Sequence, residues 1–251
     1  MRRIGFSKSA WLMATLLLPT VGFAQEPAVD LDVPGRRSAE VERDMTSKPL
    51  EVIEWIGLEP GASIADLMAG SGYHTWIFSQ YVGPEGQVWA QSSYRPDTLK
   101  ARIESGDLSG GNVHYVEQIA DLPDGEFDLV FTDRNYHDLD VEEVPAVLAT
   151  IRQKLKSGGL FVVIDARASE GRDEDGHRIA DDVIISEVTA AGFELVESSE
   201  MLANPDDDHA GGDFETRDAL DRSLLKFQSP GGEAEAGAAH EGHAPADSSG
   251  A

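Results

Sequence analysis

The sequence predicts an α/β fold in which helices cover both faces of a mostly parallel, doubly wound sheet. Three observations support this fold class. Short apolar runs alternate along the chain with segments of helical periodicity. The runs at residues 127–132 and 160–165 are almost continuously apolar, as strands buried on both faces are. The apolar run that ends at Asp66 passes through a small-residue loop directly into a helical segment, as a ligand-binding strand end does.

The remaining elements follow in a regular order. A helix is expected over residues 39–57, interrupted at Pro49, and another from Tyr73 to Val82. Further strands are expected at residues 87–91, 112–118, 193–198 and 223–227, and further helices at 96–104, 141–155 and 180–191. Glycines in the segment 156–159 and at Gly192 are expected to end the last two helices in the left-handed cap conformation.

The N-terminus carries the pattern of a secretory signal peptide. Basic residues precede an apolar run over residues 10–21, and small residues follow up to Ala24. The run is too short for an ordinary membrane span. We therefore expect cleavage after Ala24 and a periplasmic or secreted location, with an uncleaved anchor as the alternative. The expected organisation is a signal peptide at residues 1–24, a flexible leader at 25–38, one domain at 39–229 and a disordered acidic Gly/Ala/His tail at 230–251.

The charge of the chain limits its partners. It has 46 acidic and 20 basic residues and a formal net charge of -26. Such a chain repels a phosphate backbone, so we expect no nucleic-acid partner and, after signal cleavage, no membrane partner. A small molecule is the expected substrate, and the oligomeric state is left open. The chain has no cysteine, which excludes disulfides and a lipoprotein anchor.

Four segments together resemble class I S-adenosylmethionine-dependent methyltransferases: residues 66–72, 83–88, 127–130 and 155–159. The chain is similar, more narrowly, to a bacterial group of predicted methyltransferases that often carry export signals. That similarity rests on segments 135–138, 165–168, 177–179 and 204–209. The resemblance spans residues 38–230. It implies a Rossmann-like sheet of seven strands with an antiparallel last strand, and S-adenosyl-L-methionine as the cofactor.

The resemblance also implies where that cofactor binds. The loop for its methionine portion corresponds to Asp66, Ala69, Gly70 and Gly72, and Met68 stands where the family has its first glycine. Two further positions that carry acids in the family are neutral here. Ser92 replaces the acid that binds the ribose hydroxyls, and Gln118 replaces the acid near the adenine amine. Asn135 is expected to line the same pocket.

Catalytic residues are expected after the fourth strand, because methyl transfer needs alignment and, for some acceptors, removal of a proton. His137 is the candidate general base, Asp138 its orienting partner and Tyr136 a pocket residue. The alternative is that His137 and Asp138 only cap the following helix. Arg167 and Arg178 could bind an anion near Asp165, at the end of the fifth strand, or could form local ion pairs.

Three functions follow from these residues. The first is an S-adenosylmethionine-dependent methyltransferase that acts on an unknown small molecule. The second is a non-catalytic exported binding protein that kept the fold and has weakened cofactor binding, as Met68, Ser92 and Gln118 suggest. The third, a nicotinamide-dependent oxidoreductase, is disfavoured because an acid is also missing at Ser92 for that cofactor.

A metal site is not expected from the sequence. His209 follows three consecutive aspartates, Asp206 to Asp208, and carboxylates in one loop can hold a hard cation. However, the spacing matches no calcium loop, and the segment that begins at Asn204 consists of residues that are typical of ordinary turns. His240 and His243 lie in the tail that we expect to be disordered.

Overall fold

A computed structural model describes residues 29–33, 36–94, 96–108, 111–211 and 219–231 of the chain. The signal peptide predicted at residues 1–24 lies outside these residues, as does the predicted tail from residue 232 onward. No helix in the described ranges combines the length and the apolar character needed to cross a lipid bilayer.

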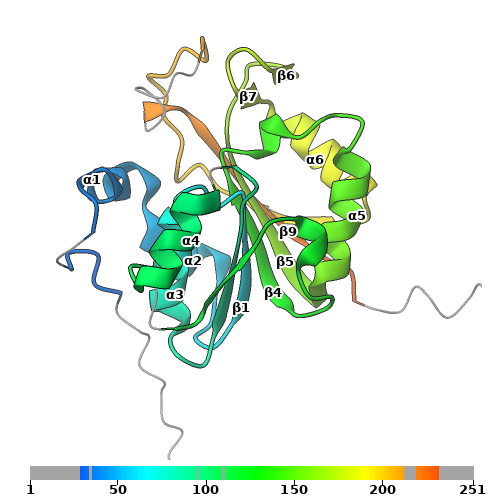
Figure 1. Cartoon of the computed structure of the whole chain (residues 1–251). Coiled ribbons are helices and arrows are strands. Elements are labelled where there is room, and N and C mark those ends of the chain that lie inside the picture. Colours follow the sequence, from blue (N-terminus) through cyan, green and yellow to red (C-terminus); the bar gives the residue numbers. More distant parts are fainter. Residues whose placement is uncertain (1–28, 34–35, 95, 109–110, 212–218, 232–251) are drawn as a thin grey trace, which may run out of the picture.

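Seven strands form one sheet with the order β3-β2-β1-β4-β5-β9-β8 (Figure 1). They are β1 (Ser63–Leu67), β2 (Gln87–Gln91), β3 (Val113–Val116), β4 (Phe127–Asp133), β5 (Leu155–Ala166), β8 (Glu194–Ser198) and β9 (Arg222–Gln228). The first five pair in parallel, and β9 is antiparallel to both of its neighbours, β5 and β8. The predicted doubly wound sheet with an antiparallel last strand is confirmed.

Helices cover both faces of this sheet. They are α1 (Ser38–Ser47), α2 (Pro49–Ile56), α3 (Tyr73–Val82), α4 (Pro96–Ser105), α5 (Val144–Lys154) and α6 (Asp181–Ala190). One apolar core lies between the sheet and α2, α3 and α4, and a second lies between the sheet and α5 and α6 (Figure 1). Lys48, in the left-handed conformation before Pro49, separates α1 from α2, so the predicted helix over 39–57 is two helices.

The glycine turn before the fifth strand differs from the expectation. Helix α5 ends at Lys154, and β5 already begins at Leu155, which pairs with Phe127 of β4. The register then jumps to Leu129 opposite Leu160, so the intervening residues form a bulge within the strand. Gly158, with φ of +76°, therefore lies in an irregular part of strand β5 and does not cap a helix. The predicted cap is wrong because pairing with β4 starts before the glycines.

Two kinds of short element were not predicted. A small hairpin joins β6 (Arg172–Asp173) to β7 (Arg178–Ile179), beyond the end of β5. A 3-10 turn, η2 (Tyr136–Asp138), follows β4, and another, η1 (Ile119–Asp121), follows β3. Two- and three-residue elements carry no periodicity that a sequence could reveal. The hairpin and η2 both lie at the edge where the carboxyl ends of β1, β4 and β5 meet.

Candidate functional site

The loop that follows β1 adopts a backbone suited to close approach by a ligand. Met68, Gly70 and Gly72 all have positive φ angles, of +51°, +58° and +88°. A Cβ added at Gly72 would lie 2.7 Å from Cδ1 of Leu108, and its φ of +88° also disfavours other residues, whereas the space around Gly70 is open. The predicted ligand loop therefore has a left-handed backbone even at Met68, where the family has glycine.

Gln91, at the end of β2, fixes this loop. Its side-chain oxygen accepts the backbone N–H of Met68 at 3.0 Å, and its main-chain carbonyl accepts the N–H of Ala69 at 2.9 Å. The side-chain amide donates in turn to the carbonyl of Glu117, beyond β3, at 2.7 Å. The loop is thus held by the last residue of the strand expected at residues 87–91.

The two neutral positions expected to contact the cofactor have different environments. Ser92 is buried, and its hydroxyl donates to the carbonyl of Tyr94 at 2.8 Å, so this group is already used inside the protein. Gln118 is exposed, just before η1. The structure therefore leaves Gln118 accessible from solvent and places the Ser92 hydroxyl in a local turn.

Asp66 lies buried at the end of β1, and the hydroxyl of Thr75 in α3 donates to it at 2.6 Å. Burial raises the pKa of Asp66 to about 7, with a further contribution from the negative charge of Asp133, and the Thr75 bond opposes the shift only in part. Asp66 is consequently a carboxyl group that changes its charge near neutral pH.

Asp133, at the end of β4, is the anion of a buried cluster. His74 of α3 lies 2.7 Å from its carboxylate, and Arg43 of α1 forms a short ion pair with the same oxygen. Burial lowers the pKa of His74 to about 4. Burial also opposes the charge of Asp133, but Arg43, Arg134 and His74 outweigh it and hold the pKa of Asp133 well below its ordinary value. This cluster attaches α1 to the carboxyl edge of the sheet.

His137 is oriented by a carboxylate, but a different one from the residue expected. Its Nδ1 lies 2.7 Å from Asp165, which is fully buried at the end of β5 and also accepts the backbone N–H of His137 at 2.9 Å. Burial opposes protonation of His137, but the hydrogen bond and the charge of Asp165 prevail and raise the pKa of His137. Asp165 therefore binds Nδ1 of the ring, and the expected partner Asp138 lies on the Nε2 side.

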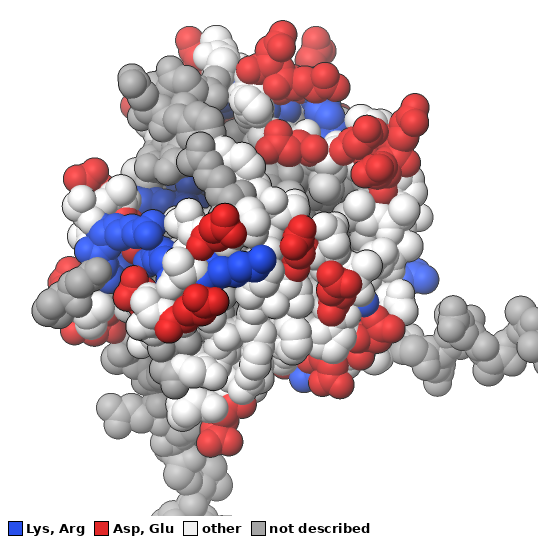
Figure 2. Space-filling view, viewed as in Figure 1, with Lys and Arg blue, Asp and Glu red and all other residues white. Residues whose placement is uncertain are grey.

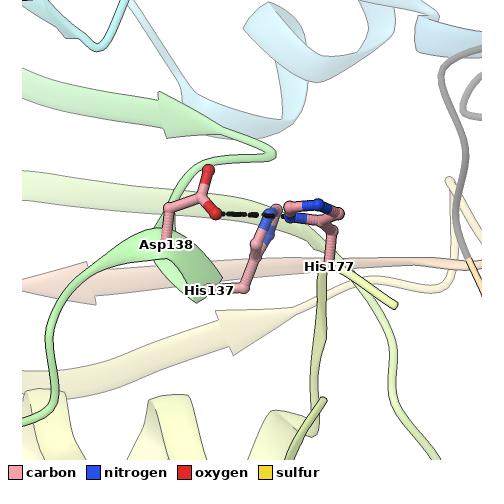
Figure 3. Close-up of side chains that lie close together, drawn as sticks. All are labelled: His137, Asp138 and His177. Carbon is pink, nitrogen blue, oxygen red and sulfur yellow. Dashed lines mark hydrogen bonds and ion pairs between the residues drawn. The ribbon is translucent and has the colours of Figure 1, made fainter. Parts of the chain in front are cut away.

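Asp138 lies on the other side of the same imidazole. Its Oδ1 is 3.4 Å from Nε2 of His137 and 3.4 Å from Nδ1 of His177, which comes from the turn between β6 and β7 (Figure 3). Both His177 and Asp138 are more than half exposed, whereas His137 is buried. His137 and Asp138 were both expected at this site, and the hairpin between β6 and β7 adds His177 to them.

Asn135 and Tyr136 have structural partners. The Asn135 amide donates to the carbonyls of Asp133, at 2.8 Å, and Met68, at 3.4 Å, and so joins the loops after β4 and β1. Tyr136 is fully buried in the core beside α5 and α6, and its hydroxyl donates to Glu187 at 2.9 Å. The structure therefore places the Tyr136 side chain in the core rather than in the expected pocket.

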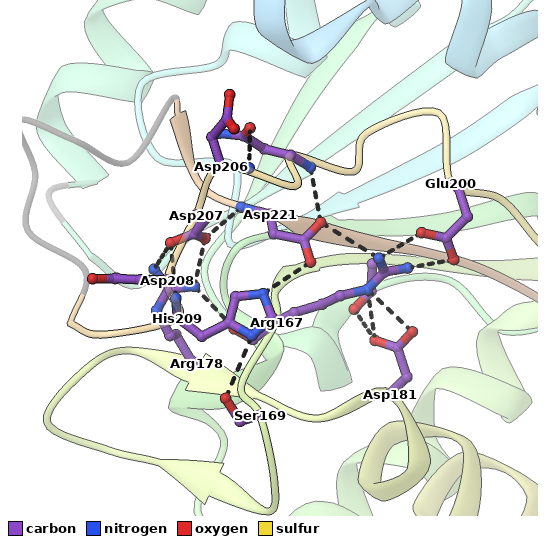
Figure 4. A network of polar contacts seen from close by, with 12 residues as sticks. Arg167, Ser169, Arg178, Asp181, Glu200, Asp206, Asp207, Asp208, His209 and Asp221 are labelled. Atoms are coloured by element: carbon purple, nitrogen blue, oxygen red, sulfur yellow. Dashed lines mark hydrogen bonds and ion pairs between the residues drawn. The ribbon is translucent and has the colours of Figure 1, made fainter.

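The arginines considered as anion ligands both bind carboxylates of the chain itself (Figure 4). Arg178 is buried and makes two hydrogen bonds to Asp207, at 2.9 and 3.0 Å. Arg167 bonds Glu200 at 2.7 and 3.0 Å and lies 3.4 Å from Asp221. His209, considered as a metal ligand, is 3.0 Å from Asp221. These residues form local ion pairs among the described residues between β5 and β9.

The sequence of this chain matches a known family over the part that builds the site. Residues 40–170 match the family model described as protein-L-isoaspartate(D-aspartate) O-methyltransferase. The chain belongs to this methyltransferase family. The matched residues run from α1 to beyond Asp165, and so include the loop after β1, Gln91 and His137.

The chain is also similar to curated proteins whose names describe methyltransferases. The chain is 35% identical over 121 residues to the ubiquinone/menaquinone biosynthesis C-methyltransferase UbiE of Shewanella piezotolerans. That match covers 45% of this chain and 46% of the relative, so the chain spans about half the length of the curated relatives it matches. An uncharacterized methyltransferase of Synechocystis is 29% identical over 117 residues, covering 45% of this chain and 51% of that relative.

Solved structures show the same fold. An S-adenosylmethionine-dependent methyltransferase from Aquifex aeolicus superposes with a TM-score of 0.60 at 17% identity, over 75% of this chain and 93% of that one. A 1,6-didemethyltoxoflavin-N1-methyltransferase from Burkholderia thailandensis, solved with 1,6-didemethyltoxoflavin and S-adenosylhomocysteine, gives 0.56 at 19% identity, over 74% and 78%. The predicted fold class is confirmed, and none of these relatives favours the non-catalytic alternative.

Proposed function

We propose that this protein is an S-adenosylmethionine-dependent methyltransferase that acts on a small molecule. The observation that carries the proposal is the loop from Met68 to Gly72, whose left-handed backbone and open space at Gly70 lie at the carboxyl end of β1. Ligands of doubly wound sheets bind at this edge, and membership of a methyltransferase family identifies the ligand class.

Each part of the site has a defined task in this proposal. The backbone of Ala69, Gly70 and Gly72 would hold the methionine portion of S-adenosyl-L-methionine, and Gln91 keeps that backbone in place. When bound, the cofactor supplies a methyl group on a cationic sulfur. Asn135 joins this loop to the acceptor side of the site, because it bonds carbonyls on both.

His137 is the proposed base for the acceptor. Asp165 accepts a hydrogen bond from Nδ1, so the lone pair of the neutral ring is on Nε2, which faces the exposed side of the site. Nε2 can take a proton from the acceptor, and the positive charge that results lies 2.7 Å from the Asp165 carboxylate. Asp165 is therefore a positioning residue, and His137 is the catalytic one.

Calorimetry of the full chain with S-adenosylhomocysteine tests the cofactor site. Gly70→Ala is expected to weaken binding at least tenfold, because the methyl group occupies the open space of the loop. Gly125→Ala is the matched control, since Gly125 also has a left-handed φ, of +66°, and open surroundings in a turn before β4. No heat from the unaltered chain at millimolar ligand, or equal weakening by both variants, would refute the proposed site.

The acceptor is identified by methyl-transfer assays. Because the family description names isoaspartyl residues, an isoaspartyl peptide is compared with small aromatic and heterocyclic acceptors. Transfer to a small acceptor supports the proposal, and transfer to the peptide alone contradicts it.

We also propose that the protein belongs to the exported group and acts in the periplasm or outside the cell. The basic residues Arg2 and Arg3, the apolar run at 10–21 and the small residue Ala24 support this location. N-terminal sequencing of the protein recovered from its native host should give a mature chain that starts at Gln25. Recovery of the uncleaved chain from the cytoplasm would contradict export.

A further inference from the structure

Two histidines and one carboxylate face one another at the exposed side of the site. Their ligand atoms, on His137, Asp138 and His177, all lie within 4.8 Å of one another (Figure 3). The imidazole rings of the two histidines meet edge to face, with centroids 5.4 Å apart. This group comes from two separate elements, η2 and the β6–β7 hairpin.

We propose that His137, Asp138 and His177 bind a divalent transition-metal ion, with Zn²⁺ as the best fit. Bonds of about 2.0–2.1 Å in a tetrahedral arrangement place neighbouring ligand atoms about 3.4 Å apart. The two separations that involve Asp138 Oδ1, to His137 Nε2 and to His177 Nδ1, are both 3.4 Å. Imidazole with one carboxylate is a donor set that suits such ions, and three protein ligands leave a fourth position open.

Asp165 supplies the outer hydrogen bond that such a site requires. A histidine that binds a metal through one ring nitrogen donates the other N–H to a carboxylate or carbonyl, which fixes its tautomer. His137 Nδ1 lies 2.7 Å from Asp165, whose two oxygens also accept the backbone N–H groups of His137 and Ala166. A carboxylate with these donors accepts from Nδ1, and Nε2 keeps its lone pair for a metal.

The hairpin that carries His177 is held in position against His137. Arg172 of β6 donates to the main-chain carbonyls of Tyr136, at 3.1 Å, and His137, at 3.0 Å, and it forms an ion pair with Glu187 of α6. His177 itself has a φ of +53°, a left-handed conformation that is uncommon outside glycine and that clusters at functional sites. The two histidines are therefore brought together by fixed contacts.

The electrostatic surroundings also favour a cation. The hairpin and the segment before it carry exposed acidic residues, including Glu170, Glu174 and Asp175. Acidic side chains gather over this part of the molecule in Figure 2, where Figure 1 places β6 and β7. A negatively charged surface raises the local concentration of cations.

The metal site adds to the proposed function without being required for it. Nε2 of His137 cannot bind a metal and accept a proton at once. In the metal-loaded protein the open coordination position would instead bind the acceptor, a role that rests on the proposed function. The metal would make an O–H or N–H group of that acceptor more acidic. Binding of the metal is measured separately from methyl transfer, so failure of either proposal is distinguishable from failure of the other.

Calorimetry with Zn²⁺ tests the site. The background for all measurements is the full chain with His240→Ala and His243→Ala, a double variant that lacks the two histidines of the tail. One Zn²⁺ per chain is expected. His177→Ala, at a side chain that is 57% exposed, should weaken binding at least tenfold. His209→Ala is the matched control and should leave the affinity unchanged. His209 has a similar left-handed φ, of +57°, but its side chain lies 3.0 Å from Asp221, away from the proposed site.

A second measurement separates ligation from a change in folding. Co²⁺ in place of Zn²⁺ should give the intense visible absorption of a four-coordinate ion, and His177→Ala should abolish it while the circular dichroism of the chain is unchanged. Asp165→Asn should weaken Zn²⁺ binding about 10–100-fold through the orientation of His137. The proposal is overturned if the His240/His243 background binds no Zn²⁺, or if His177→Ala binds it as tightly as that background.

Discussion

Replacement of Asp66 by asparagine tests whether this buried carboxyl group, which directly precedes the ligand loop, changes its charge near neutral pH. The asparagine side chain would keep an oxygen that can accept the hydroxyl of Thr75, now 2.6 Å from Asp66, but it cannot ionise. Burial raises the pKa of Asp66 from 3.8 to about 7. A group whose pKa is raised in the folded state contributes stability that is present below pH 3.8 and is lost as the pH rises through 7.

The size of the effect follows from that shift. One pKa unit corresponds to about 1.4 kcal/mol, so the whole shift is worth about 4 kcal/mol. Between pH 5 and pH 8 the unaltered chain should lose about 2.5 kcal/mol of unfolding free energy through Asp66, and Asp66→Asn should lose none. As the pH rises from 5 to 8, the unfolding free energy of Asp66→Asn should therefore increase by about 2.5 kcal/mol relative to that of the unaltered chain.

Urea unfolding of both chains at pH 5, 6, 7 and 8 measures this difference. All other titrating groups, including His74, are present in both chains and cancel. Asp121→Asn, at an exposed acid, is the control and should give a difference that does not change with pH. If Asp66→Asn gives the same flat profile as Asp121→Asn, Asp66 is ionised throughout this range and the reasoning is refuted.

Three other substitutions test the site and its supports. His137→Gln should lower the methyl-transfer rate about 10²–10⁴-fold and leave the affinity for S-adenosylhomocysteine unchanged; an unchanged rate would exclude His137 as the base. Gly72→Ala should destabilise the fold by about 1–3 kcal/mol in urea unfolding, because its Cβ would meet Leu108 at 2.7 Å. Arg178→Met should cost about 3 kcal/mol by the same assay, because it leaves the Asp207 carboxylate without its guanidinium; adding Asp207→Asn should recover part of the loss.

The fold could be predicted because local patterns and the global sheet agree. Continuous apolar runs placed β4 and β5 in the centre of the sheet, and glycine at residue 192 marked the end of α6. The same local logic failed at residues 156–159, where glycines that are typical of a helix end lie in a strand. Pairing of Leu155 with Phe127 decides that conformation, and no local pattern encodes a contact between residues so far apart in sequence.

The site could be predicted only as a set of residues near strand ends. Topology brings the ends of β4 and β5 together, so His137 and Asp165 were both expected at the ligand edge. Which carboxylate reaches Nδ1 depends on side-chain direction: Asp165 does so at 2.7 Å, whereas Asp138, the expected partner, lies 3.4 Å from Nε2. His177 joins the group through a hairpin whose strands have two residues each, too few to leave a periodic pattern in the sequence.

The departure from the family pattern at Met68 has a structural explanation in Gln91. An amide can both accept the N–H of Met68 and donate to the carbonyl of Glu117, as it does at 3.0 and 2.7 Å, whereas an ionised carboxylate can only accept. The amide therefore fixes Met68 in the conformation that glycine would adopt. Gln91 thus preserves the loop although residue 68 is not glycine, so Met68 does not argue for a protein that has lost its ligand.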